Sequence, residues 1–245
     1  DRLMGVGVVP LDDPSSAITE LEWAIDNGLE SIWIPHRAPI GHSPGHVDLE
    51  GFWARLAEAG VPFVLHVGGA PLQVARDWGN NGRGAVKDWL GGGENVRTKD
   101  AAVLHQTPEM FISMLLLDGV FDRHPTLRGA AVELGAGWVP EMCRRLDWVC
   151  RIYGRSDTSV RFERPPSEQL KEQMGFTPFS HEHLGDLVAD SAADLYLFSS
   201  DYPHLEGTKD PIGRFERSLV DVEESVKAAF YSENFLRLWP EARVS

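Results

Sequence analysis

The sequence predicts an α/β protein built from repeated strand–helix units, with a TIM-type (β/α)8 barrel as its architecture. Short apolar runs recur without alternation, as in strands that are buried on both faces of a parallel sheet. Helical patterns separate these runs and no two predicted strands are adjacent in the chain, so the connections are crossovers between parallel strands. A doubly wound open sheet is the alternative. Six strands are recognised, whereas the usual barrel has eight.

The first part of the chain holds three of these strands. The run Leu3–Leu11 is followed by a helical pattern that closes with a glycine C-cap at Gly28. Ser31–Pro35 is the second strand, and a polar loop and a second helix ending at Gly60 come after it. Val61–Gly69 is the third strand.

The second part begins with a long irregular segment, 70–106, which we interpret as a lid-like insertion because loops of this length in compact domains are usually functional or disordered. Trp78 and Trp89 favour an ordered lid. Strands and helices then alternate to the end of the chain. The strands are predicted at 127–134, 174–179 and 195–200, and the helices at 108–118, 138–153, 181–189, 214–219, 223–231 and 234–239.

Composition predicts one soluble domain over residues 1–245, since 42% hydrophobic and 24% charged residues are ordinary for a globular protein. A net charge of −14 disfavours nucleic acid and favours a small-molecule substrate. No apolar stretch is long enough for a membrane span, and no signal peptide is recognised. Two cysteines, Cys143 and Cys150, lie about two helical turns apart, too far to bridge, so a cytoplasmic location is expected.

Three candidate site residues lie at or near the ends of predicted buried strands. They are His66, Glu133 and Asp201. The carboxyl ends of parallel barrel strands meet on one face, so we expect these side chains to converge. Imidazole and carboxylate are ligands for Zn²⁺, Mn²⁺ or Fe²⁺, and such an ion activates water near neutral pH. The adjacent carboxylate could act as general base.

Each candidate also has a purely structural interpretation. His66 could be a hydrogen-bonded residue at a strand end. Glu133 could be neutralised by Arg128 or Arg144, and Asp201 could cap the next helix. His204, three residues after Asp201, is expected to support Asp201 or to contact substrate.

The remaining histidines are weaker candidates. His36, His42 and His46 are expected to be solvated loop residues. The stretch Gly41–Gly45 fits Gly-x-Ser-x-Gly, but its serine lies in mid-loop rather than on a strand–helix turn, so we interpret it as a chance match.

Several stretches together resemble the amidohydrolase-related metal-dependent hydrolases, in the branch that contains aminocarboxymuconate-semialdehyde decarboxylase. The similarity spans nearly the whole chain, and its motifs are Val64–Gly68, Val132–Pro140, Phe198–His204 and Phe230–Leu238. The resemblance implies a distorted (β/α)8 barrel with one metal, usually zinc. It also implies that His66 and Asp201 are metal ligands and that Asp201 takes part in proton transfer.

Two departures from the family pattern limit what the resemblance implies. The family's opening strand carries a His-x-His pair that supplies two further ligands, whereas this chain has that spacing only at His181–His183. Leu3–Leu11 matches the third family strand, so the first two strands are expected to be absent from this chain. In the decarboxylases a catalytic histidine occupies the position of Leu134, which leaves Glu133 as a candidate ligand, orienting group or base.

These observations lead to three hypotheses. The first is a metal-dependent hydrolase of the amidohydrolase type, acting on a small cyclic or carboxylated substrate and forming a homo-oligomer, with Asp201, Glu133 and His204 as catalytic residues. The second is a non-oxidative decarboxylase of an aromatic or unsaturated acid. The third is a catalytically inactive binding or scaffold protein, whose metal site is weak or empty because His66 and Asp201 alone would hold an ion poorly.

Overall fold

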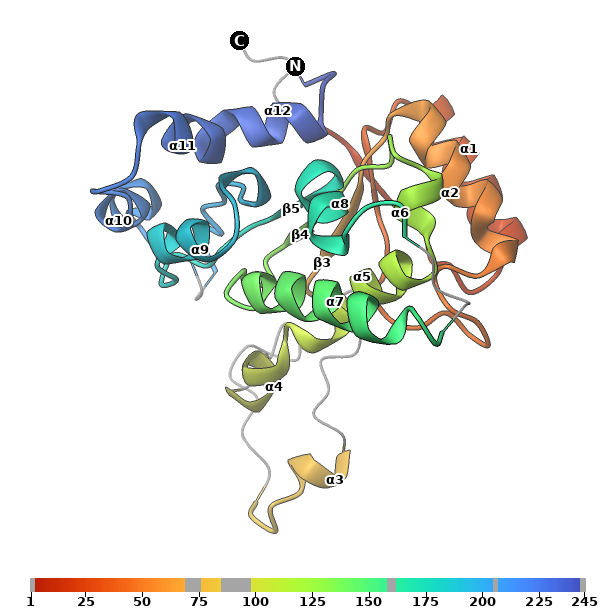
Figure 1. Cartoon of the computed structure of the whole chain (residues 1–245), viewed down its shortest axis with the longest axis horizontal. Helices are drawn as coiled ribbons and strands as arrows, with labels where there is room; N and C mark the ends of the chain where they lie inside the picture. The colour runs from red at the N-terminus through yellow and green to blue at the C-terminus, as the bar shows by residue number, and fades with distance from the viewer. Residues whose placement is uncertain (1–2, 69–75, 85–97, 158–161, 205–206, 243–245) are drawn as a thin grey trace.

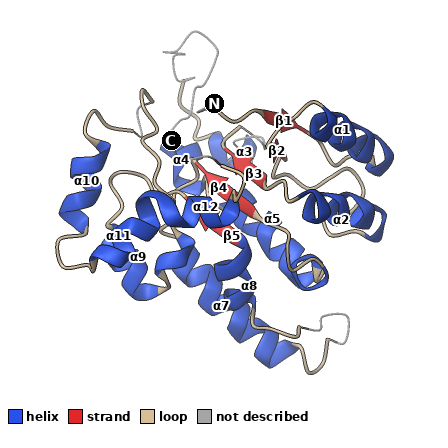
Figure 2. Ribbon diagram, turned by 90° about the horizontal axis from the view of Figure 1, so that it is seen from above, coloured by secondary structure: helices blue, strands red, loops and turns tan. Residues whose placement is uncertain are grey.

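A parallel β-sheet forms the centre of the protein (Figures 1 and 2). The computed structural model describes residues 3–68, 76–84, 98–157, 162–204 and 207–242. Among these, five parallel strands pair in the order β1-β2-β3-β4-β5. They are β1 (Val6–Val8), β2 (Ser31–Trp33), β3 (Phe63–His66), β4 (Gly129–Val132) and β5 (Met174–Phe176). Each strand lies beside the next one in the sequence, as in a barrel, whereas a doubly wound sheet reverses its order at one point.

The predicted sixth strand lies beside β5 but pairs with it only briefly. A single parallel bridge joins Tyr196 to Phe176, and the Leu197 N–H donates to the Phe176 carbonyl at 2.9 Å. The next N–H, that of Phe198, donates instead to the carbonyl of Phe230 at 3.0 Å. The segment 195–200 therefore lies beside β5, as predicted. Beyond the bridge, the Phe198 N–H bonds to the C-terminal helical region instead of to β5.

Helices surround the sheet and connect its strands (Figures 1 and 2). The described helices are α1 (Pro14–Asp26), α2 (Glu50–Ala59), α3 (Arg76–Gly79), α4 (Thr98–Val103), α5 (Gln106–Leu117), α6 (Val120–Arg123), α7 (Val139–Tyr153), α8 (Pro166–Gln173), α9 (Leu184–Asp190), α10 (Pro211–Ser218), α11 (Glu224–Ala228) and α12 (Asn234–Leu238). Short 3-10 helices cover Val47–Leu49 and Ala193–Leu195, and a π-helical turn, Ala229–Glu233, joins α11 to α12.

The turns that start and end α1 and α2 follow from local sequence. The Ser16 N–H donates to the side chain of Asp13, the N-cap of α1. Gly28 and Gly60 follow α1 and α2 with φ of 72° and 65°, in the left-handed region that glycine adopts without strain. The predicted ends of these two helices are confirmed.

Helix α8 was not predicted, because its sequence is polar and shows no apolar face. Its buried face includes two glutamines, Gln169 and Gln173, which are almost fully enclosed. Gln173 Nε2 donates to the carbonyls of His124 at 2.9 Å and Leu127 at 3.1 Å. These hydrogen bonds satisfy the buried amide nitrogen of Gln173, a polar residue that hydropathy alone would place on the surface.

Neighbouring residues of one strand pack into different clusters, because side chains alternate across a sheet. The larger cluster includes Phe63 and Phe176 and packs against the surrounding helices. The smaller cluster includes Ala130 and Leu197 on the opposite face, covered by Trp239 after α12. Trp239 Nε1 donates to the Ser31 hydroxyl at 2.7 Å, so the end of α12 is anchored to β2.

Residues 70–75 and 85–97 of the predicted lid, 70–106, lie outside the described residues, and Trp89 is among them. Its described parts include α3 and α4, and α3 lies below the body of the protein in Figure 1. Trp78 in α3 is 80% exposed.

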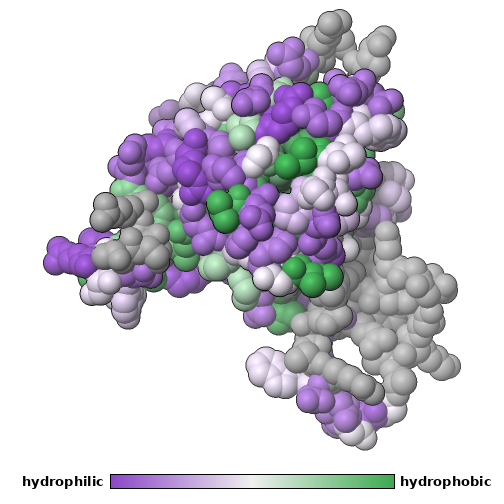
Figure 3. Space-filling view, turned by 90° about the vertical axis from the view of Figure 1, so that its right-hand side faces the viewer, coloured by the Kyte–Doolittle hydropathy of each residue, from purple (hydrophilic) through white to green (hydrophobic). Residues whose placement is uncertain are grey.

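The surface is predominantly hydrophilic on the face drawn in Figure 3, in agreement with the strongly negative net charge. Within the described segments, no helix has the length and apolar character that crossing a membrane requires.

Candidate metal centre

The predicted site residues converge at the carboxyl ends of the strands. His66 is the last residue of β3, and Glu133 follows β4 directly. The parallel register pairs His66 with Val132, so Glu133 starts its loop next to the end of β3. The positive φ of Glu133 departs from strand geometry, in which its side chain would point to the opposite face from Val132. Asp201 and His204 follow the sixth extended segment.

Short polar contacts join all four side chains. Glu133 lies at the centre, with Oε2 2.8 Å from His66 Nε2 and Oε1 2.9 Å from His204 Nδ1. His204 Nδ1 is also 3.2 Å from Asp201 Oδ1. One ligand atom from each of Glu133, Asp201 and His204 lies within 4.8 Å of the others. The site therefore contains two imidazoles and two carboxylates.

This geometry excludes two of the structural interpretations that the sequence left open. The partners of Glu133 are His66 and His204, not Arg128 or Arg144. The next described helix after Asp201 is α10, whose N-cap is Asp210.

The backbone is strained at both carboxylates. Glu133 has φ of 58° and Asp201 has φ of 49°, and they are the two non-glycine residues with positive φ among those described. This conformation costs about 1–2 kcal/mol for a residue with a Cβ atom. Such strain persists where the surrounding structure enforces it, and it is concentrated at functional sites.

The electrostatics favour the charged forms of the central pair. The hydrogen bond with Glu133 is the main cause that raises the pKa of His66 above its usual value. Burial by itself would raise the pKa of Glu133, but the hydrogen bonds from His66 and His204 outweigh it and hold that pKa below its usual value.

The donor set fits a divalent transition metal. His66 Nδ1 donates to the carbonyl of Val67 at 2.8 Å, which leaves Nε2 as the atom directed at Glu133. A hydrogen bond from the second ring nitrogen to a carbonyl is the usual support of a histidine ligand. Imidazole and carboxylate groups suit Zn²⁺, Mn²⁺ or Fe²⁺, and Glu133, Asp201 and His204 have ligand atoms close enough together to share one ion.

The structure adds supporting residues that sequence analysis missed. Thr177 Oγ1 accepts the N–H of Glu133 at 3.0 Å. Thr177 follows β5, so the strand-end rule that identified His66 could have identified it. Trp33 packs edge-on against the His66 ring, with 5.5 Å between ring centroids.

His36 corrects an expectation. It was expected to be solvated, but it is 2% exposed, and its Nε2 donates to the His66 carbonyl at 3.1 Å. Burial lowers the pKa of His36 to about 4, so this imidazole is neutral at pH 7.

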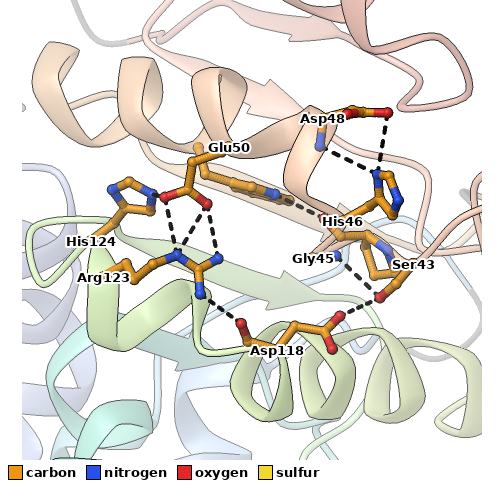
Figure 4. Close-up of polar contacts among 10 residues, drawn as sticks. Ser43, Gly45, His46, Asp48, Glu50, Asp118, Arg123 and His124 are labelled. Atoms are coloured by element: carbon orange, nitrogen blue, oxygen red, sulfur yellow. Dashed lines mark hydrogen bonds and ion pairs between the residues drawn. The ribbon is translucent and has the colours of Figure 1, made fainter. Parts of the chain in front are cut away.

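The Gly-x-Ser-x-Gly stretch contacts the end of α5 and not the four residues described above (Figure 4). Ser43 donates its hydroxyl hydrogen bond to Asp118 and accepts one from the Gly45 N–H at 3.2 Å. Beside it is a cavity of about 680 Å³ whose lining includes Glu50 and Arg123 but none of the four residues of the metal centre. The bond to Asp118 ties this loop to the end of α5.

Comparison with known proteins identifies the family. A family model described as amidohydrolase matches residues 1–240, so the chain belongs to the amidohydrolase family. The resemblance inferred from the sequence is confirmed.

Among curated proteins, gamma-resorcylate decarboxylase from Rhizobium sp. is 27% identical over 216 residues, which cover 83% of this chain and 60% of that protein. The chain thus spans about three fifths of the length of this relative. A crystal structure of an amidohydrolase from Mycobacterium avium subsp. paratuberculosis has a TM-score of 0.77 and 28% identity, covering 97% of this chain and 57% of that one.

A dihydroxybenzoic acid decarboxylase from Polaromonas sp. was solved with bound manganese and the inhibitor 2-nitroresorcinol. It matches with a TM-score of 0.67 and 19% identity, covering 98% of this chain and 70% of that chain. At this identity the likeness concerns the fold.

Proposed function

We propose that this protein is a metal-dependent, non-oxidative decarboxylase of a hydroxylated aromatic acid. The observation that carries the proposal is the cluster of His66, Glu133, Asp201 and His204 at the carboxyl ends of the strands, in a chain of the amidohydrolase family. The decarboxylases among its relatives favour this second hypothesis over the hydrolase that the sequence first suggested.

The metal would be held by Glu133, Asp201 and His204, whose ligand atoms lie within 4.8 Å of one another. The family resemblance also implies His66 as a ligand, and its Nε2 lies 2.8 Å from Glu133 Oε2. A divalent ion there would supply positive charge to hold a substrate carboxylate and a neighbouring hydroxyl oxygen. Zinc is the ion that the family resemblance implies, and manganese is the ion in the Polaromonas enzyme.

Decarboxylation breaks the bond between the ring carbon and the carboxyl carbon, and carbon dioxide leaves. The electron pair of that bond stays on the ring carbon, which must then receive one proton. Asp201 is the proposed donor, in agreement with the role that the resemblance implies. His204 is partly exposed and its Nδ1 lies 3.2 Å from Asp201 Oδ1, so it can return a proton from solvent to Asp201.

Glu133 has a different role from the histidine expected at the next position. Leu134 is 1% exposed and belongs to the hydrophobic core, so its side chain does not serve the site. Glu133 accepts from His66 and His204 simultaneously, and we propose that it orients these two rings.

The test is an assay of purified, Mn²⁺- or Zn²⁺-loaded protein with gamma-resorcylate, measuring released carbon dioxide and the phenolic product. The expected result is equimolar formation of both, and its loss in Asp201→Asn. Asp186→Asn is the matched control, because Asp186 is a highly exposed residue of α9 outside the site.

Other outcomes distinguish the remaining hypotheses. Hydrolysis of cyclic amides or esters without carbon dioxide release would replace the proposal by the hydrolase. Failure to turn over a panel of hydroxybenzoates, cyclic amides and esters, with metal bound, would favour the inactive binding protein.

A further inference from the structure

The carboxylate of Glu182 lies among backbone N–H groups of two loops at the same end of the sheet. Gly137 donates to Glu182 Oε1 at 2.6 Å, and Ala136 donates to Oε2 at 3.0 Å. Phe179 donates to Oε2 at 2.6 Å. The first two donors belong to the loop after β4, which begins with Glu133, and the third belongs to the loop after β5.

The loop after β4 fits closely around this carboxylate. A Cβ atom on Gly137 would lie 2.8 Å from Glu182 Oε1, closer than such atoms approach. Gly135 has φ of 67°, and a Cβ atom there would meet the Phe179 ring at 3.0 Å. The glycines of Gly-x-Gly in this loop are therefore required by the approach of residues 179–182.

These contacts restrain the loop that carries Glu133. At its start, the Glu133 N–H is held by Thr177 Oγ1. Three residues later, Ala136 and Gly137 are held by Glu182. Glu133 has a positive φ that an unrestrained residue with a Cβ atom would leave. Holding the loop at both ends keeps Glu133 in this conformation, with its carboxylate directed at His66 and His204.

We infer that Glu182 is a positioning residue of the metal centre: by binding the loop after β4 to the loop after β5, it sets the Glu133 carboxylate between His66 and His204. This inference rests on the metal centre of the proposed function. Charge-assisted hydrogen bonds to backbone N–H groups are strong and directional, which suits the task. Groups that orient metal ligands in this way typically change metal affinity 10–100-fold when they are removed.

A purely structural role is the competing explanation, since Glu182 also satisfies N–H groups just before α7. That role predicts lower thermal stability and unchanged metal binding. The positioning role predicts a change in the metal centre itself, so the decisive measurement is metal affinity rather than stability.

The experiment compares Glu182→Gln and Glu182→Ala with the matched control Glu141→Ala. Glu141 is an exposed glutamate of α7 whose carboxylate pairs with Arg144 on the surface. Mn²⁺ dissociation constants are measured by electron paramagnetic resonance of free Mn²⁺, and hydrogen exchange is followed at the amides of Ala136 and Gly137.

Both Glu182 variants are expected to bind Mn²⁺ about tenfold more weakly than wild type and to exchange these two amides faster. Glu141→Ala is expected to match wild type in both measurements. Wild-type Mn²⁺ affinity in folded Glu182→Gln would overturn the inference, whatever the change in melting temperature. Should Glu182→Ala fail to fold, the Mn²⁺ affinity of the nearly isosteric Glu182→Gln variant tests the inference.

Failure of the proposed function gives a different result. If wild type binds Mn²⁺ but releases no carbon dioxide, the decarboxylase is refuted. The positioning role is then still tested by comparing the Mn²⁺ dissociation constants of wild type and the Glu182 variants. If wild type binds no Mn²⁺, the metal centre is refuted and this inference with it.

Discussion

Replacing Glu133 by glutamine removes the negative charge that lies between His66 and His204 and keeps the size of the side chain. Glu133 is 11% exposed and accepts hydrogen bonds from His66 at 2.8 Å and His204 at 2.9 Å. A hydrogen bond to a charged group contributes about 1.5–3 kcal/mol. Both histidines are more than one third exposed, so solvent screening reduces the combined contribution to about 2 kcal/mol. We expect Glu133→Gln to lower the melting temperature of the metal-free protein by about 4–8 °C.

The pH dependence of this loss follows from the two pKa shifts. The raised pKa of His66 stabilises the fold below its usual value of 6.5, and this contribution is lost as pH rises through the folded-state pKa. The lowered pKa of Glu133 stabilises the fold above its usual value of 4.5, and this contribution is lost as pH falls. The stability difference between wild type and Glu133→Gln should therefore be largest between these two values.

The assay is chemical unfolding of metal-free protein at a series of pH values, combined with NMR titration of the histidine rings. In Glu133→Gln the pKa of His66 should fall toward its usual value, because the bond from Glu133 is the main cause of its elevation. Glu141→Gln, at an exposed position of α7, is the control. An unchanged His66 pKa, or a stability difference that does not vary with pH, would refute the reasoning.

Three further predictions concern the supports of the site and the metal. Thr177→Val removes the acceptor of the Glu133 N–H, so it should lower the free energy of unfolding in urea by about 1–2 kcal/mol and should also weaken metal binding. A loss of stability with unchanged metal affinity would contradict this prediction. Trp239→Phe leaves the buried Ser31 hydroxyl without its donor and should cost about 2 kcal/mol or more in unfolding free energy, whereas Trp23→Phe, at a 60% exposed position, should change it little. Chelation of bound metal should lower the melting temperature and abolish carbon dioxide release, and added Mn²⁺ should restore both; a melting temperature indifferent to chelator would argue against a metal held by these residues.

The strands that carry the candidate site, and the site residues at their ends, could be predicted from the sequence. Buried strands of a parallel sheet read as unbroken apolar runs, and polar residues where such runs end lie on one face. His66, Glu133 and Asp201 were found in this way, and the structure brings them together with His204. The helix ends at Gly28 and Gly60 could also be predicted from the sequence, because a left-handed backbone conformation favours glycine in any context.

Contacts between residues far apart in the chain could not be predicted from the sequence. Glu133 could have paired with an arginine as well as with a histidine. The tertiary structure made the choice, because β3 and β4 end side by side and Glu133 leaves β4 in a left-handed backbone conformation. The buried face of α8 carries Gln173, whose partners are carbonyls more than forty residues away, so the polar sequence of this helix did not indicate burial.

The sequence by itself therefore determined the repeated strand–helix units, the parallel sheet and the strand ends at which histidine and carboxylates appear, since these depend on residue type and spacing along the chain. Only the tertiary structure decided that Glu133 lies between two imidazoles in a strained backbone conformation. It also decided that Thr177 and Glu182 hold the loop of Glu133 through its N–H groups. Hydrogen bonds to backbone amides depend on where two loops meet, and nothing in the side-chain pattern of either loop specifies that meeting.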